Sequence, residues 1–348
     1  MGWVIDMTIK ILGIDIAKST FQLHGADNSG KVVLKKRLPR HKLAAYIANL
    51  PSCTIVMESC GGANYWARTF QRSGHTVKLI SPQFVKPFVK TNKNDANDAQ
   101  AIVEAASRPS MNFVPIKQLE QQDIQSIHRI RTRTVKNRTA LINEIRGLCL
   151  EYGIVLAAGA ARVKSSLCAV ITDSDNELTP ISRESMQALY DELIDVETRL
   201  KKLDTKVRQL CRQNKNCQRI LKISGVGELT ATAIVAAVSD PREFRNGRHM
   251  SAWLGLVPRQ SSSGDKQVLL GISKRGDRYL RTLLIHGARA VLNHCKDLDN
   301  DYFRWVGRKK AGLSHNIAAI ALANKNARIL KNLQLDTAHR GHGTDEGE

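Results

Sequence analysis

The chain has few cysteines, few acidic residues and no long apolar run. Its seven cysteines include no Cys-x-x-Cys pair. That usage excludes a disulfide framework and a zinc ribbon, so we expect reduced thiols in the cytoplasm. Apolar runs all fall short of the roughly 18 residues that a membrane span needs. Only 32 acids stand against 53 lysines and arginines, a net charge of +21. This surplus favours a polyanionic partner, because neutralising phosphates releases counterions.

At 348 residues the chain is long enough for two or three domains. Its first part predicts a meander of three strands, then helix, strand, helix, strand and helix. The segments that carry this pattern are TIKILGID, TFQLHGAD, KVVLKKR, HKLAAYIANL, CTIVMES, NYWARTFQRSG, HTVKLI and the stretch opened by Asp95. This order matches the RNase H-like fold, a mixed sheet covered by helices. We therefore expect an α/β domain of this class over 8–155.

Four acidic residues stand where that fold brings segments together. Asp15 follows the apolar run ILGI and Glu58 follows TIVM, at strand ends that are neighbours in this topology. Charge directly after a buried strand is costly unless it is paired or binds a metal. Asp95 and Asp98 share a helix face, although helix capping alone also explains that pair.

The convergence of four acids favours a metal site over capping. Oxygen ligands without His or Cys favour Mg²⁺ or Mn²⁺. Such ions stabilise both the attacking and the leaving oxygen in phosphoryl transfer, so the site indicates that reaction on a nucleic acid.

Two helical stretches follow. Residues 117–150 predict one long helix or a pair, with basic residues that either contact phosphate or form a solvated face. These are Arg129, Arg131, Arg133, Lys136 and Arg138. From Leu189 to Leu210 apolar residues are spaced 4-3-4-3-4-3, a heptad pattern. It predicts a coiled-coil arm over 156–216, which either joins subunits or packs as a hairpin on its own chain.

The last part, 217–335, predicts a mostly α-helical domain. The segment LKISGVGELTATAIVAAV has the form of a helix-hairpin-helix. Gly225 and Gly227 would let backbone N–H groups approach a phosphate, or would only cap the turn. The polar tail from Asp336, residues 336–348, is expected to be disordered.

A serine cluster lies inside this last domain. Ser261 to Gly264 is expected to form a loop. Serines beside glycine usually indicate a linker, but a serine ringed by cations suits a phosphoserine nucleophile. Physical reasoning neither chooses among Ser261, Ser262 and Ser263 nor excludes a phosphate-binding loop. The surrounding cations are Arg259, Lys266, Lys274, Arg275, Arg278 and Arg281.

Taken together, the motifs resemble the DEDD transposases of the insertion-sequence 110 family, in order from about Thr8 to Leu333. They are GIDIAKS, VMES, NDANDA, SGVG and GLVPRQSSSG…SKRGDRYLR, and the last spacing resembles the 1111 subgroup. The resemblance implies a RuvC-like domain that supplies the four acids, a coiled-coil arm for assembly and a C-terminal transposase domain with a serine nucleophile. The family's serine precedes a glycine shortly after GLxPR, which places it on Ser263.

The resemblance also implies an element-encoded RNA that pairs with donor and target DNA in a bacterial nucleoid. We therefore expect an RNA-guided, site-specific DNA recombinase that assembles as a dimer or tetramer. Asp15, Glu58, Asp95 and Asp98 would bind Mg²⁺, and Ser263 would attack the scissile phosphate. Arg259, Lys266 and Arg275 would neutralise that phosphate. The alternatives are a hydrolytic junction nuclease, in which water attacks, and a non-catalytic nucleic-acid scaffold.

Overall fold

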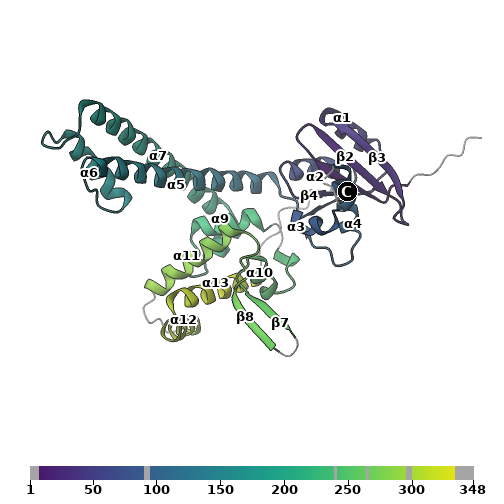
Figure 1. Ribbon diagram of the computed structural model, residues 1–348. Coiled ribbons are helices and arrows are strands. Elements are labelled where there is room, and N and C mark those ends of the chain that lie inside the picture. The colour runs from purple at the N-terminus through teal and green to yellow at the C-terminus, as the bar shows by residue number, and fades with distance from the viewer. Residues whose placement is uncertain (1–7, 90–94, 239–240, 264–265, 295–299, 334–348) are drawn as a thin grey trace, which may run out of the picture. The chain divides into compact units, whose positions relative to one another are not determined.

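The computed structural model describes residues 8–89, 95–238, 241–263, 266–294 and 300–333. The chain divides into two compact units, 1–118 and 119–348 (Figure 1). No helix within the described ranges is long and apolar enough to cross a membrane.

The first unit is built on a six-stranded sheet in the order β3-β2-β1-β4-β5-β6. The first three strands form an antiparallel meander, β4 and β5 add in parallel, and β6 is antiparallel. The predicted order of strands and helices is confirmed, while α3, η1 and β6 were not predicted. The elements are β1 (Ile11–Ile16), β2 (Thr20–Ala26), β3 (Val32–Pro39), α1 (Arg40–Ala48), β4 (Thr54–Glu58), α2 (Ala63–Arg72), β5 (Thr76–Ile80), α3 (Pro82–Val85), η1 (Lys86–Phe88), α4 (Asp95–Ala106) and β6 (Phe113–Val114).

Side chains of β4 alternate between the two faces of this sheet. Ile55 and Met57 belong to a buried cluster with Leu43 of α1 and Phe70 of α2. Val56 belongs to a second cluster with Ile102 of α4. Helices therefore cover both faces, which is why the central strands are nearly continuous apolar runs.

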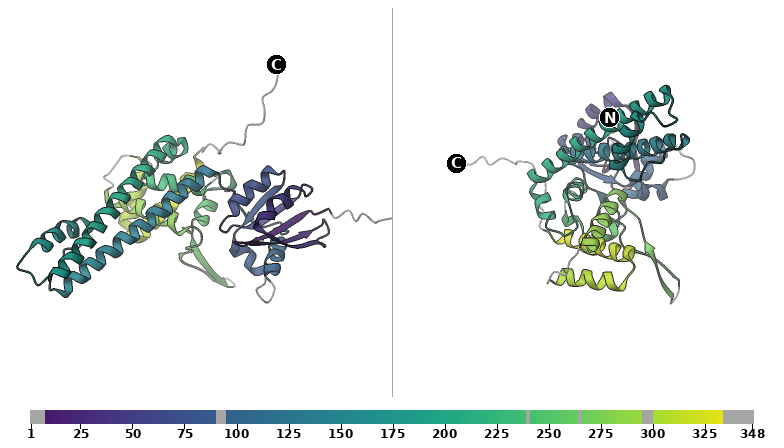
Figure 2. Two further views of the ribbon diagram at one scale, coloured as in Figure 1. Left: turned by 90° about the horizontal axis from the view of Figure 1, so that it is seen from above. Right: turned by 90° about the vertical axis from the view of Figure 1, so that its left-hand side faces the viewer.

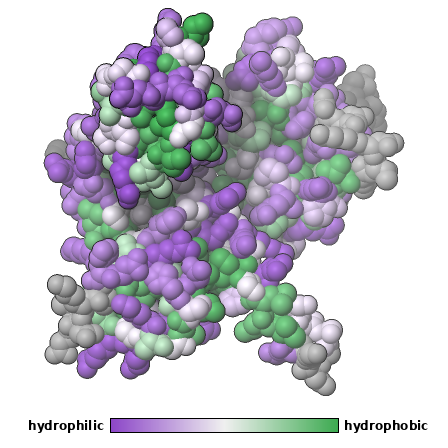
Figure 3. Space-filling view, turned by 60° about the vertical axis from the view of Figure 1, so that its left-hand side comes forward, coloured by the Kyte–Doolittle hydropathy of each residue, from purple (hydrophilic) through white to green (hydrophobic). Residues whose placement is uncertain are grey.

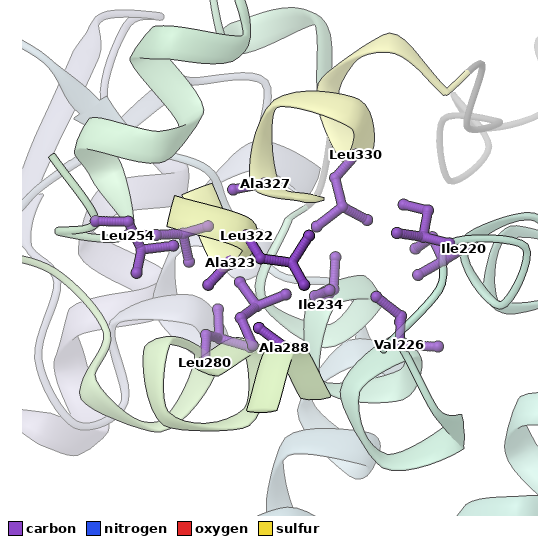
Figure 4. Close-up of a cluster of buried hydrophobic side chains, with 14 of the residues drawn as sticks. Ile220, Val226, Ile234, Leu254, Leu280, Ala288, Leu322, Ala323, Ala327 and Leu330 are labelled. Atoms are coloured by element: carbon purple, nitrogen blue, oxygen red, sulfur yellow. The ribbon is translucent and has the colours of Figure 1, made fainter. Parts of the chain in front are cut away.

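The second unit is helical apart from one β-hairpin, as far as the structure describes it. Its elements are α5 (Leu119–Glu151), α6 (Ala160–Thr172), α7 (Pro180–Gln213), α8 (Lys215–Ile220), α9 (Glu228–Ala237), η2 (Pro241–Glu243), α10 (Gly247–Trp253), β7 (Pro258–Ser263), β8 (Lys266–Ile272), α11 (Arg278–His294), α12 (Asp301–Gly312) and α13 (His315–Asn332). Residues such as Ile234, Leu254, Leu280 and Leu322 join α9 to α13 around one core (Figure 4). The expected mostly helical character of this region is confirmed.

The heptad positions of α7 are used within the chain. Met186, Leu193, Leu200 and Val207 are buried, and α7 lies along α5 (Figures 1 and 2). The other heptad position is half-buried at Leu189, Val196, Leu203 and Leu210. Of the two interpretations of this pattern, the structure shows the intramolecular hairpin.

By its contacts, helix α5 lies in the second compact unit, while the expected domain boundary at 155 stays a prediction. Its residues Leu141 and Ile145 share a buried cluster with Leu193 of α7. The apolar stripe of α5 thus packs on other helices and not on the sheet. The pattern in the sequence predicted the stripe but not its partner.

Candidate active site

Two of the four acids lie side by side at one edge of the sheet. Strands β1 and β4 are parallel, with Ile14 paired to Met57, so Asp15 and Glu58 occupy the next positions on each strand. Gly13 and Val56 face α4. Because side chains repeat the same face every second residue, Asp15 and Glu58 face α4 as well.

Gly13 brings α4 onto this edge. A Cβ atom at Gly13 would lie 2.6 Å from the Ala99 carbonyl oxygen and 2.7 Å from Val103 Cγ2. Only glycine permits this close packing of α4 on β1, and Asp98 lies in the first turn of α4. Sequence reasoning missed Gly13, although a glycine inside a buried strand is a recognised signal of close backbone approach.

The charges of Asp15 and Asp98 act on Glu58. Burial raises the pKa of Glu58, and the negative charges of Asp15 and Asp98 raise it further. All three side chains are half-buried. Asp95 is the first residue of α4, but its side chain lies outside the described residues. Among the described side chains, no group of three or more His, Cys, Asp or Glu has metal-binding geometry.

The serines lie in a β-hairpin, so the expected loop was wrong for Ser261 to Ser263. They form the end of β7 and pair with β8, with Ser263 opposite Lys266. Backbone pairing builds this ladder whatever the side chains are, and the Gly264–Asp265 dipeptide was the overlooked hairpin signal. Gly264 and Asp265 themselves lie outside the described residues.

The hairpin separates the three serines. All are exposed, but Ser262 Oγ accepts a 2.9 Å hydrogen bond from Gln260 Nε2. Alternation along the strand puts Ser261 and Ser263 on the opposite face from Ser262. Leu269 and Leu270 of β8 are also exposed. Figure 3 shows hydrophilic side chains over much of one face of the molecule, with smaller hydrophobic patches between them.

The cations around the hairpin have different roles. Arg259, Lys274 and Arg275 are exposed, and the Lys266 side chain lies outside the described residues. Arg281 is buried, and its Nη1 donates to the carbonyl oxygens of Leu254 and Arg275, each at 3.1 Å. Arg281 therefore holds two backbone segments together and is not part of an exposed ring of charge, contrary to expectation.

The basic residues of α5 also divide. Arg129, Arg133 and Lys136 are exposed. Arg131 pairs with Asp204 of α7 at 2.5 Å. Arg138 has a buried Nε without a hydrogen-bond partner among the described residues. Three of the five predicted contacts are therefore available to phosphate, while Arg131 already neutralises an acid of its own chain.

The two glycines of the SGVG turn also have different surroundings, one packed and one open. Gly225 has φ +85°, and a Cβ there would lie 2.8 Å from the carbonyl oxygen of Gly287 in α11. Gly227 caps α9 and has open space around it. Packing against α11 thus explains Gly225 without a ligand, and Gly227 remains the candidate for phosphate contact.

Comparisons with known proteins identify the family of this chain. A family model described as "Transposase" matches residues 12–154, and one described as "Transposase IS116/IS110/IS902 family" matches residues 217–304. The chain is 50% identical to the transposase for insertion sequence element IS1111A of Coxiella burnetii, over 92% of this chain and 88% of that protein. It is 47% identical to a probable family 20 transposase of Pseudomonas aeruginosa, over 93% and 96%.

A third relative is the transposase for insertion sequence element IS1328 of Yersinia enterocolitica, 37% identical over 92% of this chain and 95% of that protein. The first family model begins inside β1 and covers Asp15, Glu58, Asp95 and Asp98, while the second includes the SGVG turn and the serine hairpin. The chain belongs to the IS116/IS110/IS902 family of transposases.

Proposed function

We propose that this transposase cuts and rejoins DNA by transesterification, with Ser263 as nucleophile and Asp15, Glu58, Asp95 and Asp98 as metal ligands. The observation that carries the proposal is that Asp15 and Glu58 lie side by side at the edge of the sheet, facing the helix that carries Asp98. Burial raises the pKa of Glu58 there, and the charges of Asp15 and Asp98 raise it further. Three half-buried carboxylates on one face oppose folding unless a cation or proton offsets them.

The residues fit a hard divalent cation. Their donors are all carboxylate oxygens, which suit Mg²⁺ or Mn²⁺ better than zinc. When bound, such an ion supplies positive charge to the non-bridging oxygens of a phosphodiester. Asp15 and Glu58 would hold it from rigid strands, and Asp98 from the first turn of α4.

Ser263 would carry the covalent step. Its Oγ forms a bond to phosphorus while a bond from phosphorus to a deoxyribose oxygen breaks. The serine proton leaves, and the departing oxygen becomes a hydroxyl. Attack on the phosphoserine by a hydroxyl from the partner DNA strand then restores the serine. No phosphodiester energy is lost to water, so rejoining needs no ATP.

A denaturing gel tests the serine step. End-labelled DNA from the element's junction is incubated with the protein, Mg²⁺ and flanking RNA. A labelled band at protein size is expected in the wild type and in Ser262→Ala, and its absence is expected in Ser263→Ala. Ser262 is the matched control because its hydroxyl lies on the other face of β7. Cleaved DNA without an adduct, unchanged in Ser263→Ala, would mean that water attacks and that this enzyme is a hydrolytic nuclease.

We further propose that the protein works with a structured guide RNA and as a homo-oligomer. The net charge of +21 and the exposed Arg129, Arg133 and Lys136 support an RNA partner. Half-buried Leu189, Val196 and Leu203 on α7 support further packing of the helical arm. Light scattering of the protein, alone and with the RNA, should give the mass of a dimer or tetramer, and a monomer in both samples would contradict the second proposal.

A further inference from the structure

A cavity of about 620 Å³ opens in the first unit on the α1 and α2 side of the sheet. Three segments line it: the turn between β1 and β2, the start of α1 and the start of α2. They contribute Lys18 and Ser19, Arg40 and His41, and Tyr65 and Trp66, respectively. The transposition chemistry proposed above uses none of these residues.

The cavity is positively charged. Lys18 and Arg40 line it, no acidic residue does, and neither cation takes part in an ion pair with any described residue. The Arg40 guanidinium lies 5.2 Å from the Trp66 ring centroid and 5.9 Å from that of Phe21. Its backbone N–H donates to the Ser19 carbonyl oxygen at 2.9 Å. Aromatic rings and a 3.5 Å hydrogen bond from its Nη1 to the Lys18 carbonyl oxygen hold Arg40 in place. No carboxylate among the described residues neutralises its charge, which leaves that charge for an anion.

The cavity also offers aromatic surface. Tyr65 is 51% exposed, whereas Trp66 is 4% exposed. The indole Nε1 of Trp66 is buried without a hydrogen-bond partner among the described residues. Buried donors are rarely left unpaired, so this indole N–H needs an explanation. The exposed Tyr65 ring is the aromatic surface that the cavity offers to a ligand.

We propose that this cavity binds one unpaired nucleotide of a nucleic-acid strand. The base stacks on Tyr65, and the phosphate lies between Lys18 and Arg40. Aromatic stacking combined with a cationic groove is how proteins hold single strands without reading their sequence. A volume of about 620 Å³ lies within the range of small-molecule sites, so a nucleotide fits.

The cavity lies at the same end of the sheet as the carboxylates, and the proposal therefore rests on the proposed function. Lys18 follows Asp15 by three residues, and Ala63, which opens α2, follows Glu58 by five. The acids face α4, whereas the cavity lies on the opposite face. A strand that crosses this edge would present its phosphate to the acids and insert a flanking nucleotide into the cavity, which would fix the register of the scissile bond.

Binding of fluorescent oligonucleotides in EDTA tests this without any cleavage. The full-length protein is titrated with dT10, with rU10 and with a duplex of equal length, at several salt concentrations. Tyr65→Ala should weaken single-strand binding at least fivefold, and Tyr65→Phe should leave it nearly unchanged. Lys18→Gln should lower the salt slope by about 0.7, while Lys42→Gln, an exposed neighbour outside the cavity, should not.

If Tyr65→Ala weakens the binding of dT10 more than that of rU10, the strand in the cavity is DNA. The reverse result identifies it as RNA. Photocrosslinking of a 5-iodouracil oligonucleotide should mark Tyr65 or Trp66 in mass spectra of the digested adduct. Equal weakening by Lys18→Gln and Lys42→Gln, or equal binding by Tyr65→Ala and wild type, would overturn the proposal. Because EDTA suppresses the metal-dependent step, failure of the phosphoserine mechanism leaves these results unaffected.

Discussion

Glu58 is the residue at which the metal proposal can be tested without measuring activity. Its folded pKa is raised by burial, Asp15 and Asp98, so Glu58 keeps its proton to a higher pH in the folded protein than in the unfolded chain, where its pKa is about 4.5. Stability of the metal-free protein therefore falls as the pH rises through the folded pKa of Glu58. Asp98→Asn removes one repelling charge and should raise the urea midpoint at pH 7.

A divalent ion should stabilise the wild type more than Asp98→Asn, because the variant lacks one of the proposed ligands. At 100 times its dissociation constant, Mn²⁺ should stabilise the wild type by about 2.7 kcal/mol. It should stabilise Asp98→Asn much less, and Asp195→Asn, an exposed change on α7, as much as the wild type. Equal stabilisation of Asp98→Asn and wild type would show that Asp98 is not a ligand.

His128 should make the second unit sensitive to acid. It is 4% exposed, its Nδ1 lies 2.9 Å from the Tyr279 hydroxyl, and its Nε2 lies 3.0 Å from Thr232 Oγ1. Burial, with a smaller effect of Arg131, lowers the pKa of His128 to about 4. Since the unfolded histidine protonates near pH 6.5, stability is lost as the pH falls below that value.

The expected loss is about 2 kcal/mol between pH 7 and pH 5. His128→Gln should remove most of this dependence, whereas the exposed His315→Gln should keep it. Urea denaturation of the three proteins at both pH values measures the difference. If His128→Gln retains the full dependence, another group is responsible.

At the scale of elements, the contact of α4 with β1 depends on Gly13. Gly13→Ala places a methyl group against a backbone carbonyl that cannot rotate away, so α4 must shift. The cost should be about 1–3 kcal/mol, with weaker Mn²⁺ binding because Asp98 moves with the helix. Gly61→Ala is the matched control, because a Cβ there meets nothing within 4 Å. Equal urea midpoints for the two variants would contradict this account.

The SGVG turn gives a second comparison between elements. Gly287→Ala would place a Cβ against the carbonyl oxygen of Gly225 and force the turn away from α11, so stability should fall by about 1–3 kcal/mol. Gly227→Ala meets open space and should keep its stability but lose duplex DNA affinity if the turn contacts phosphate. Unfolding midpoints together with DNA titrations separate the two effects. Unchanged DNA affinity in Gly227→Ala would leave the turn a purely structural feature.

What could be predicted from the sequence depended on the range of the interaction. The proximity of Asp15 and Glu58 followed from strand order alone, because parallel strands end at the same edge. Gly13 carried the signal of a glycine inside a buried strand, but the residues that Gly13 and Gly287 contact could not be predicted, since they lie far along the chain. The strand that contains Ser261 to Ser263 was predicted as a loop, because its serine-rich composition was given more weight than the Gly-Asp signal of a hairpin turn. Arg131 was misjudged because its partner, Asp204, lies on a different helix.

At the scale of the whole molecule, the end of the first unit is the last prediction. Two contacts fasten residue 117 to α2: the Arg68 guanidinium donates to the Lys117 carbonyl oxygen at 2.5 Å, and the Lys117 N–H donates to Asn64 Oδ1 at 2.9 Å. The cores on both faces of the sheet lie wholly before this point. Fragment 8–118 should therefore unfold in one cooperative urea transition and be stabilised by Mn²⁺.

Two further fragments bracket that boundary. Fragment 8–110 lacks β6 and the Lys117 contacts, so its urea midpoint should be lower. Fragment 8–155 adds α5 without α7, which leaves Leu141 and Ile145 without their partner Leu193. It should gain no stability and should associate in light scattering, because an uncovered apolar stripe favours aggregation. A monomeric fragment 8–155 that is more stable than 8–118 would contradict this account. It would show that α5 folds with the first unit and that the first domain ends near residue 155.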